Sequence, residues 1–419
     1  MNWMLAHLQP PHLKAMANTA CPFEWDIIDF PGGFRPGRRL HWLMCHMAPD
    51  MRRRQGLPGP HTYWEADRLW QELEHGRLLG LLPYGRLPEL LPPGLREYVA
   101  RWLENPAVRL WDFDQRHAQL TVPNLDFTGW FDHCISTIRH LTTVQCIGAT
   151  ATARQDSKIV IGPWNHGGFG KSELGEFDFG IGAGLDHHQE IIRWFDFWLK
   201  GRDTGVDSLL PVRYFVIGSG KWKNAESWPP ASYQAVKFCL DAEADEGGQD
   251  LALRPVQPPQ DQSKVSYTYN PLDPVPTLWS RTLYSEPGNR RRLDYRQDIL
   301  RYRSAPLIES REIAGDATVL LFVSCTTPDT DLFARLVDEP PEGPALEIAY
   351  GMVRARHRLS LEREDFLVPG EITEIEIRLG PTANCFLPGH RIRLEITSSD
   401  FPSHDRNHNT GKNDLFSPC

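Results

Sequence analysis

Two ionisable residues, Asp132 and His166, each follow a short apolar run and lie in the loop after it. The first run reads V-P-N-L-D-F-T-G-W-F-D and ends on Asp132, and the second reads S-K-I-V-I-G-P-W-N-H and ends on His166. A short apolar run followed by glycine and a helical segment is typical of a parallel strand in an α/β sheet. Functional groups in such sheets lie at the carboxyl ends of the strands. We therefore expect this carboxylate and this imidazole to meet at one edge of a sheet.

The chemistry that this pair suggests is hydrolysis. An aspartate that orients a histidine, and a histidine that acts as general base, are two members of a hydrolytic triad. In α/β-hydrolases the chain order is Ser, then Asp or Glu, then His, and Asp132 and His166 fit the last two places. The serine would lie in a G-x-S-x-G turn, which is absent from all 419 residues. The nearest match, Gly218-Ser219-Gly220, follows a strand of the later β-rich part and cannot be that turn.

Neighbouring residues admit other interpretations. Cys134 could be imagined as a substitute nucleophile, but it begins a helix on the loop of the acid itself, which disfavours that role. Trp130 and Trp164 flank the two candidates and either wall a substrate pocket or pack the loops. Asp126 lies inside the first apolar run, where a buried carboxylate needs partners. Its position suggests a local disturbance of that strand.

Composition and length exclude several protein classes. A chain of 419 residues is expected to form two or three domains. The hydrophobic content of 41% and charged content of 24% indicate a globular protein. A net charge of -9 gives no reason to expect nucleic acid or an anionic membrane as a partner, and no apolar run approaches the roughly 18 residues of a spanning helix. The eight cysteines form no C-x-x-C pair, so neither a disulfide framework nor a metal site is predicted.

The hydrophobic pattern divides the chain into four parts. Residues 1–20 resemble a remnant of an α/β domain, and residues 21–118 have helical spacing and form an inserted cap. Residues 119–208 hold the two candidate strands and their helices. From 209 to 419 the period changes to two, with many short strands separated by Gly and Pro and no helices between them. This pattern favours a β-sandwich or jelly roll.

Several segments, in order along nearly the whole chain, resemble one family. They are P-P-H-L-K-A-M, T-G-W-F-D, I-G-P-W-N-H, F-D-F-W-L-K-G, Y-N-P-L-D-P-V-P-T, D-T-D-L-F-A-R-L-V-D and F-L-P-G-H-R-I-R-L-E-I-T-S-S-D-F-P. The sequence is similar to the CocE/NonD serine hydrolases, the group of cocaine esterase and the Xaa-Pro dipeptidyl-peptidases. The resemblance implies an α/β-hydrolase domain, a helical cap and a C-terminal jelly roll. It also implies that Asp132 is the triad acid and His166 the base.

The nucleophile does not carry over from the family. The family serine lies in a G-x-S-Y-x-G turn just upstream of the helix that leads to P-P-H-L-K, and Met1 falls at or just after that turn. We therefore expect a fragment without the serine, without one oxyanion donor and without the first strands, inactive by itself. The strands at 122–127 and 159–162 would then present an unpaired edge. The C-terminus also stops before the last strand that the family usually has.

The resemblance implies hydrolysis of esters or amides through an acyl-enzyme, with no metal or organic cofactor. Candidate substrates are an N-terminal dipeptide ending in Pro, an α-amino acid ester, a β-lactam side chain and an aryl ester. Homo-oligomer formation stays open. The first residues do not read as a signal peptide, so a cytoplasmic location is favoured, although a missing N-terminus makes this uninformative. The alternative is a non-catalytic protein whose β-sandwich binds a ligand or partner.

Overall fold

An α/β sheet of five strands carries the two candidate loops. The computed structural model describes residues 2–22, 24–106, 114–245, 247–248, 250–255 and 264–417. The strand order is β1-β2-β3-β6-β7. Strands β1 (Met16–Thr19), β2 (Asn124–Gly129), β3 (Lys158–Gly162) and β6 (Val212–Val216) are parallel, and β7 (Lys221–Ala225) is antiparallel to β6. The expected pair of parallel strands is therefore confirmed.

Two details of the sheet differ from the sequence expectations. The strand at 212–216 was expected to open the β-sandwich at residue 209, but β6 pairs in parallel with β3 and extends the α/β sheet. Its Tyr214, Phe215 and Val216 are all buried, as befits a strand covered on both faces. The expected edge at 122–127 and 159–162 is also wrong, because β1 pairs with β2 and forms the edge itself.

Helices cover both faces of this sheet. Helix α8 (Thr137–Ile147) packs against the face that contains Ile161, and α10 (His187–Lys200) packs through Trp194 against the face that contains Phe127. The short helices α1 (Asn2–Ala6) and α9 (Ala151–Asp156) lie over the end of the sheet where β2 begins. Among the described residues, the helices lack the combination of length and apolarity that a bilayer crossing requires.

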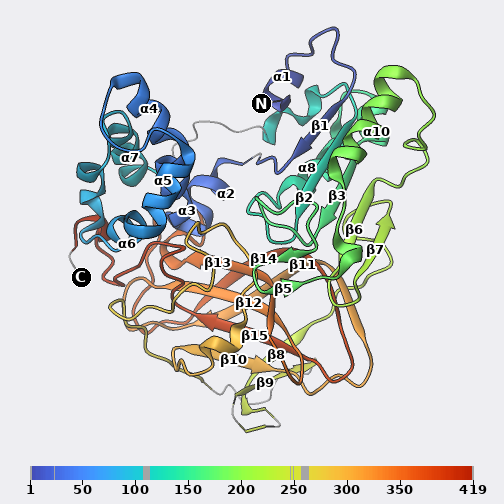
Figure 1. The fold of residues 1–419 in the computed structure, drawn as a ribbon. Coiled ribbons are helices and arrows are strands. Elements are labelled where there is room, and N and C mark those ends of the chain that lie inside the picture. The colour runs from blue at the N-terminus through green and yellow to red at the C-terminus, as the bar shows by residue number, and fades with distance from the viewer. Residues whose placement is uncertain are drawn as a thin grey trace.

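The helical part is inserted between β1 and β2, which are neighbours in the sheet, and stands beside the sheet in Figure 1. It has its own core, centred on Trp70, Leu87 and Trp102. The helices of this part confirm the helical spacing expected for residues 21–118. The helices of this part are α2 (Trp25–Asp29), α3 (Gly37–Trp42), α4 (Ala48–Gln55), α5 (Tyr63–Leu69), α6 (His75–Leu79) and α7 (Leu95–Glu104), with π-helical turns at Leu43–Met47 and Trp70–Glu74 and 3₁₀ turns at Pro31–Gly33, Tyr84–Leu90 and Asp114–Gln119.

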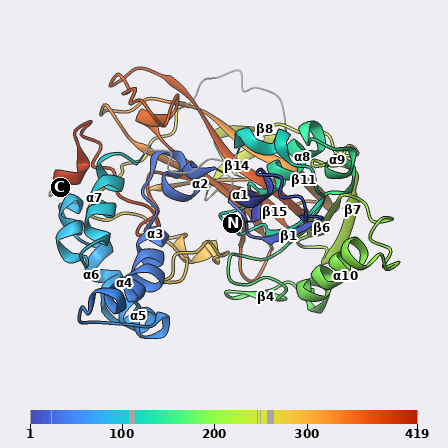
Figure 2. The ribbon, with the colours of Figure 1, turned by 90° about the horizontal axis from the view of Figure 1, so that it is seen from above.

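The β-rich part lies below both the helical part and the α/β sheet in Figure 1, and Figure 2 shows the same two parts side by side from above. Its larger sheet has the order β13-β12-β15-β10-β9-β8, and the long strands β11 and β14 pair separately. One apolar core, which includes Val319, Ile348, Ile377 and Leu394, joins the two sheets as a sandwich. The strands are β8 (Phe238–Ala244), β9 (Leu251–Pro255), β10 (Ile299–Arg303), β11 (Arg311–Val323), β12 (Asp331–Glu339), β13 (Leu346–Arg354), β14 (Thr373–Phe386) and β15 (Arg391–Thr397).

A buried network of ion pairs stabilises the larger sheet from within. Glu395 accepts bonds from Arg290 at 2.6 and 2.9 Å and pairs with Arg393 at 2.6 Å. Arg335 bridges Glu347 and Asp400, each at 2.8 Å. Because buried charges are costly unless they are paired, these residues depend on one another.

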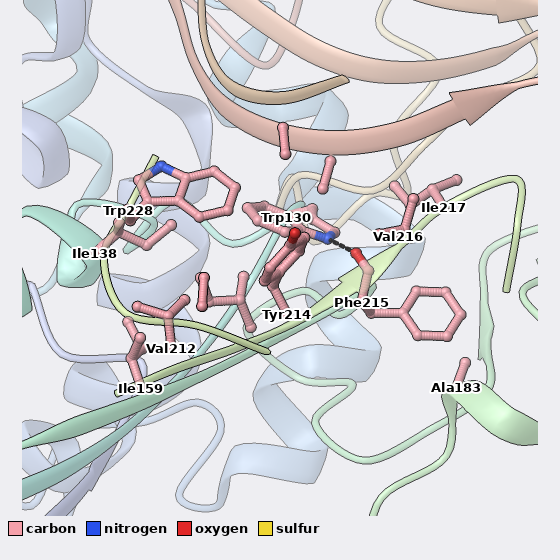
Figure 3. Packing of buried hydrophobic residues seen from close by; sticks show 14 of the residues in the cluster. Trp130, Ile138, Ile159, Ala183, Val212, Tyr214, Phe215, Val216, Ile217 and Trp228 are labelled. Atoms are coloured by element: carbon pink, nitrogen blue, oxygen red, sulfur yellow. Dashed lines mark hydrogen bonds between the residues drawn. The ribbon is translucent and has the colours of Figure 1, made fainter. Parts of the chain in front are cut away.

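The α/β sheet and the β-sandwich share one core and are joined by a β-bridge. Figure 3 shows this core, where the indole Nε1 of Trp130 donates to the carbonyl of Phe215 at 2.7 Å. Directly after β6, the amide of Ile217 donates to Ala383 at 3.0 Å, and Cys385 donates back to Ile217 at 2.8 Å. Since Ala383 and Cys385 belong to β14, the residue after β6 ties the α/β sheet to the sandwich.

Candidate active site

The two candidate loops cross closely because both preceding strands end in glycine. Gly129 and Gly162 pair across β2 and β3. A Cβ on Gly129 would lie 2.1 Å from the carbonyl oxygen of Trp164, and one on Gly162 would lie 2.3 Å from its indole. The amide of Phe131 donates to the same carbonyl at 3.0 Å. The absence of two side chains thus lets the loop after β2 pack directly on the loop after β3.

This crossing brings Asp132 and His166 together, as the sequence predicted. Nδ1 of His166 lies 3.1 Å from Oδ1 of Asp132. Asp132 is buried, and its Oδ1 also accepts the backbone amide of Cys134 at 2.9 Å. The carboxylate therefore has a fixed orientation. Because the aspartate occupies Nδ1, the other ring nitrogen of His166 is the one available to take a proton.

Two aromatic side chains hold the ring of His166, and neither was predicted. The ring of Tyr284 stacks on it with a centroid separation of 5.5 Å and an interplanar angle of 7°. His133 lies against it at 4.5 Å. The adjacent Ser285 donates to the carbonyl of Phe131 at 2.8 Å and so ties this segment to the loop of the acid. The His166 side chain stays 36% exposed, which leaves it accessible to a reactant.

Burial controls the protonation of the two residues after Asp132. Burial lowers the pKa of His133 well below its usual value, and the positive charge of Arg38 lowers it further. Burial and the charge of Asp132 raise the pKa of the Cys134 thiol well above its usual value. The sulfur also lies 3.9 Å from Nδ1 of His166, the nitrogen already bonded to the acid. A protonated thiol beside the wrong nitrogen is a poor nucleophile, so the structure, like the sequence, disfavours Cys134 in that role.

Among the described residues, His166 forms side-chain hydrogen bonds through Nδ1 alone, to Asp132 and weakly to Cys134. No serine joins this network within that part of the chain. The described residues thus bring an acid and a base together without a serine nucleophile.

Residues 204–417 match the family model of the X-Pro dipeptidyl-peptidase C-terminal non-catalytic domain. Cocaine esterase from Rhodococcus sp. (strain MB1 Bresler) is 33% identical over 308 residues, which cover 71% of this chain and 52% of that protein. The chain belongs to the CocE/NonD family of serine hydrolases. It spans about half the length of the curated relatives that it matches. A putative serine esterase of Mycobacterium bovis is also 33% identical, over 304 residues, or 65% of this chain and 44% of that protein.

Several solved structures share the fold of this chain. An aminopeptidase from a marine sediment Thaumarchaeota archaeon aligns with a TM-score of 0.77 and 23% identity, covering 99% of this chain and 70% of that one. An α-amino acid ester hydrolase aligns equally well, with 21% identity and the same coverage. A CocE/NonD hydrolase of Staphylococcus aureus aligns with a TM-score of 0.58 and 16% identity, covering 98% and 66%. At these identities the likeness concerns the fold, an α/β-hydrolase with a β-rich domain.

The two tryptophans of the family motifs are core residues here. Trp130 is 6% exposed and packs against Trp228, and Trp164 is 1% exposed and donates from Nε1 to the carbonyl of Lys171 at 3.0 Å. Of the two roles considered from the sequence, these positions favour packing of the loops over walling a substrate pocket.

Asp126 does not disturb its strand, contrary to the expectation. β2 pairs in regular register with β1 and β3 on both sides of it. The carboxylate faces α8, where Nε2 of His140 lies 3.7 Å away and His117 contacts the other nitrogen of His140 at 2.6 Å. Asn18 and Asn124, bonded to each other at 2.6 Å, lie beside it. A separate cluster of buried polar groups therefore accommodates Asp126.

Protonation explains how this cluster tolerates a carboxyl group. Burial raises the pKa of Asp126 to about 7, and the amides of Asn124 and Asn18 offset this only in part. Burial lowers the pKa of His140 well below its usual value. Below pH 7 both groups are mostly neutral, so the strand avoids a large part of the cost of burying charge.

Proposed function

We propose that Asp132 and His166 are the acid and base of a serine hydrolase that cleaves esters or amides through an acyl-enzyme. The observation that carries this proposal is the 3.1 Å contact between Nδ1 of His166 and Oδ1 of Asp132. His166 takes the proton of the serine and later delivers it to the leaving group. Asp132 holds the tautomer and stabilises the imidazolium. The reaction needs no metal or organic cofactor.

The serine and its oxyanion hole come, in this proposal, from residues beyond these 419. The sequence contains no G-x-S-x-G turn, and the chain spans 52% of cocaine esterase. Because loss of a triad member alone costs orders of magnitude in rate, the chain as it stands is expected to be inactive. Esters are the first substrates to test, since two of the relatives described above are esterases by name. Dipeptides ending in Pro and β-lactam side chains follow.

Reconstitution tests the proposal directly. A segment of about 100–150 residues that carries the serine turn, taken from a relative, is fused ahead of Met1. The fusion is assayed with aryl esters, α-amino acid esters, β-lactams and dipeptide-Pro amides. We expect ester hydrolysis that falls by about 10⁴-fold in Asp132→Asn and by up to about 10⁶-fold in His166→Ala.

His188→Ala is the matched control, because His188 is an exposed histidine on α10. It should retain full activity. A folded fusion that contains the serine but hydrolyses none of these substrates would overturn the proposal. It would favour the alternative that the β-sandwich serves as a binding module.

A further inference from the structure

The acid and the base belong to a larger set of metal-ligating side chains. One donor atom each from Asp132, His133, Cys134 and His166 lies within 4.8 Å of every other. Three of the four are consecutive on the loop after β2, and the fourth is on the loop after β3. A carboxylate, two imidazoles and a thiol are the ligand types that Zn²⁺ binds in proteins. Catalysis by the proposed triad uses only two of them.

The separations fit a tetrahedral ion. Ligands at the usual Zn–S and Zn–N or Zn–O lengths lie about 3.3–3.6 Å from one another in a tetrahedron. Oδ1 of Asp132 lies 3.1 Å from Nδ1 of His166 and 3.4 Å from Nδ1 of His133. Sγ of Cys134 lies 3.9 Å from Nδ1 of His166. These three separations differ from the tetrahedral values by only a few tenths of an ångström, and the other three are no longer than 4.8 Å.

Two buried polar atoms in this set lack a partner. Nδ1 of His133 and Oδ2 of Asp132 make no hydrogen bond to any part of the chain that the structure describes. Buried polar atoms are normally satisfied, so an unpaired nitrogen directed at a carboxylate is unusual. The 3.4 Å contact between the two residues is an ion pair only when His133 is protonated. A cation at this point satisfies the ring without protonating it.

The set is also held in place before any ion binds. The backbone amide of Cys134 fixes Oδ1 of Asp132, and Tyr284 stacks on His166. Partners of this kind orient metal ligands and raise affinity. Asp132 and Cys134 are buried, whereas His166 is partly exposed and provides the route from solvent.

We propose that Asp132, His133, Cys134 and His166 form a zinc-binding site. Binding breaks the S–H bond of Cys134 and forms a Zn–S bond, and the proton leaves to solvent, because a coordinating thiol loses its proton. Nδ1 of His166 also gives up the proton that it donates to Asp132, and Nε2 takes up one from solvent, so the ring stays neutral. The carboxylate and the thiolate together balance the two charges of the ion. No oxidant or reductant takes part.

The site has a regulatory consequence that rests on the proposed function. A zinc ion on Nδ1 of His166 takes the place of the hydrogen bond to Asp132, so the imidazole can no longer cycle as a base. Zinc is therefore expected to inhibit the reconstituted hydrolase reversibly. Metal binding itself needs no serine and can be measured on the 419-residue chain.

Co²⁺, a spectroscopic substitute for Zn²⁺, tests the site on that chain. We expect one ion per chain, with intense visible bands of four-coordinate cobalt and a thiolate-to-cobalt charge-transfer band in the near ultraviolet. Zn²⁺ should displace the cobalt and abolish both signals. Cys134→Ser should remove the charge-transfer band. His133→Gln should weaken cobalt binding by at least about 10–100-fold, because mutation of residues that merely support metal ligands already lowers affinity by that factor.

Cys45→Ser is the matched control. His41, Cys45 and Asp67 form the other such group among the described residues, within the helical part. The charge-transfer band should survive Cys45→Ser. If the charge-transfer band were lost in Cys45→Ser but kept in Cys134→Ser, the metal would bind in the helical part and the proposal would be overturned. Folded protein that gives no cobalt spectrum at all would overturn it as well.

In the reconstituted enzyme, activity should be higher with a chelator than with zinc. In Cys134→Ser this difference should shrink, so that the ratio of the two activities falls towards one. A cobalt spectrum without any hydrolysis would refute the hydrolase and leave the metal site standing. Hydrolysis without a cobalt spectrum would do the reverse.

Discussion

Asp126→Asn should change how the stability of this protein depends on pH. Asp126 is 1% exposed, and burial raises its pKa from 3.8 to about 7. A difference of roughly three pKa units corresponds to about 4 kcal/mol between the two protonation states. The folded state therefore binds more protons than the unfolded state between about pH 4 and 7. Stability from this group is fully present below pH 4 and is lost as pH rises to 7.

Asparagine removes this effect because its amide cannot ionise and has nearly the same shape. We expect Asp126→Asn to be more stable than the wild type by up to about 4 kcal/mol at pH 8, with an advantage that shrinks steadily towards pH 4. The measurement is urea unfolding of both proteins at pH 5, 6, 7 and 8, with the midpoint and slope fitted at each pH.

The comparison between variants isolates Asp126 from its neighbours. His140, whose pKa is lowered by burial, adds a slope of the opposite sign, and His117 and Cys21 also lie beside the cluster. These groups are present in both proteins, and the Cys21 thiol, whose pKa of about 12 is raised in part by Asp126, titrates above the pH range of the measurement. Asp207→Asn, at an exposed aspartate, is the control and should leave the pH profile unchanged. A profile for Asp126→Asn parallel to the wild type, or a loss of stability at pH 8, would refute the reasoning.

Three further outcomes can be tested on the same chain. Glu395→Gln should lower the free energy of unfolding by about 3–5 kcal/mol, measured by urea, because it removes the buried carboxylate that Arg290 and Arg393 share. A loss below 1 kcal/mol would contradict the importance of the network. Gly129→Ala should lower the free energy of unfolding by at least about 1–3 kcal/mol in the same assay, since the added Cβ would clash with the carbonyl of Trp164. An unchanged free energy of unfolding would show that the loops do not cross as described. A fluorophosphonate probe should leave the chain unlabelled, and stoichiometric labelling seen by mass spectrometry would reveal an unrecognised nucleophile.

The sequence was sufficient to predict the acid–base pair because the pattern that marks each residue lies next to it in the chain. Each of Asp132 and His166 follows an apolar run and a glycine, and parallel strands bring such positions to one edge. Tyr284 was missed for the opposite reason. It comes from a segment without strand or helix, more than a hundred residues after His166, and reaches the imidazole only through tertiary packing.

The misassignment of β6 has a related cause. The run P-V-R-Y-F-V-I is as compatible with a sandwich strand as with a parallel strand, and only its pairing with β3 decides between them. The role of Asp126 was misinterpreted because the sequence prediction assumed that its carboxyl group is charged. In the folded chain, burial beside Asn18 and Asn124 keeps this group largely protonated below pH 7. Pairing partners and protonation are properties of the folded chain, and no window of sequence contains them.

The β-bridge between Ile217 and β14 restricts how this chain can be recombined with its relatives. The match to the C-terminal domain model begins at residue 204, which makes the linker before β6 look like a natural exchange point. If the parts were exchanged there, β6 would have to pair with a β3 from a different protein. If they were exchanged just after β6, Ile217 would have to bond to residues from a different protein in place of Ala383 and Cys385. Either chimaera must match two interfaces at once. Viable hybrids should therefore exchange the sheet and the sandwich together, so that the two parts are inherited as one unit.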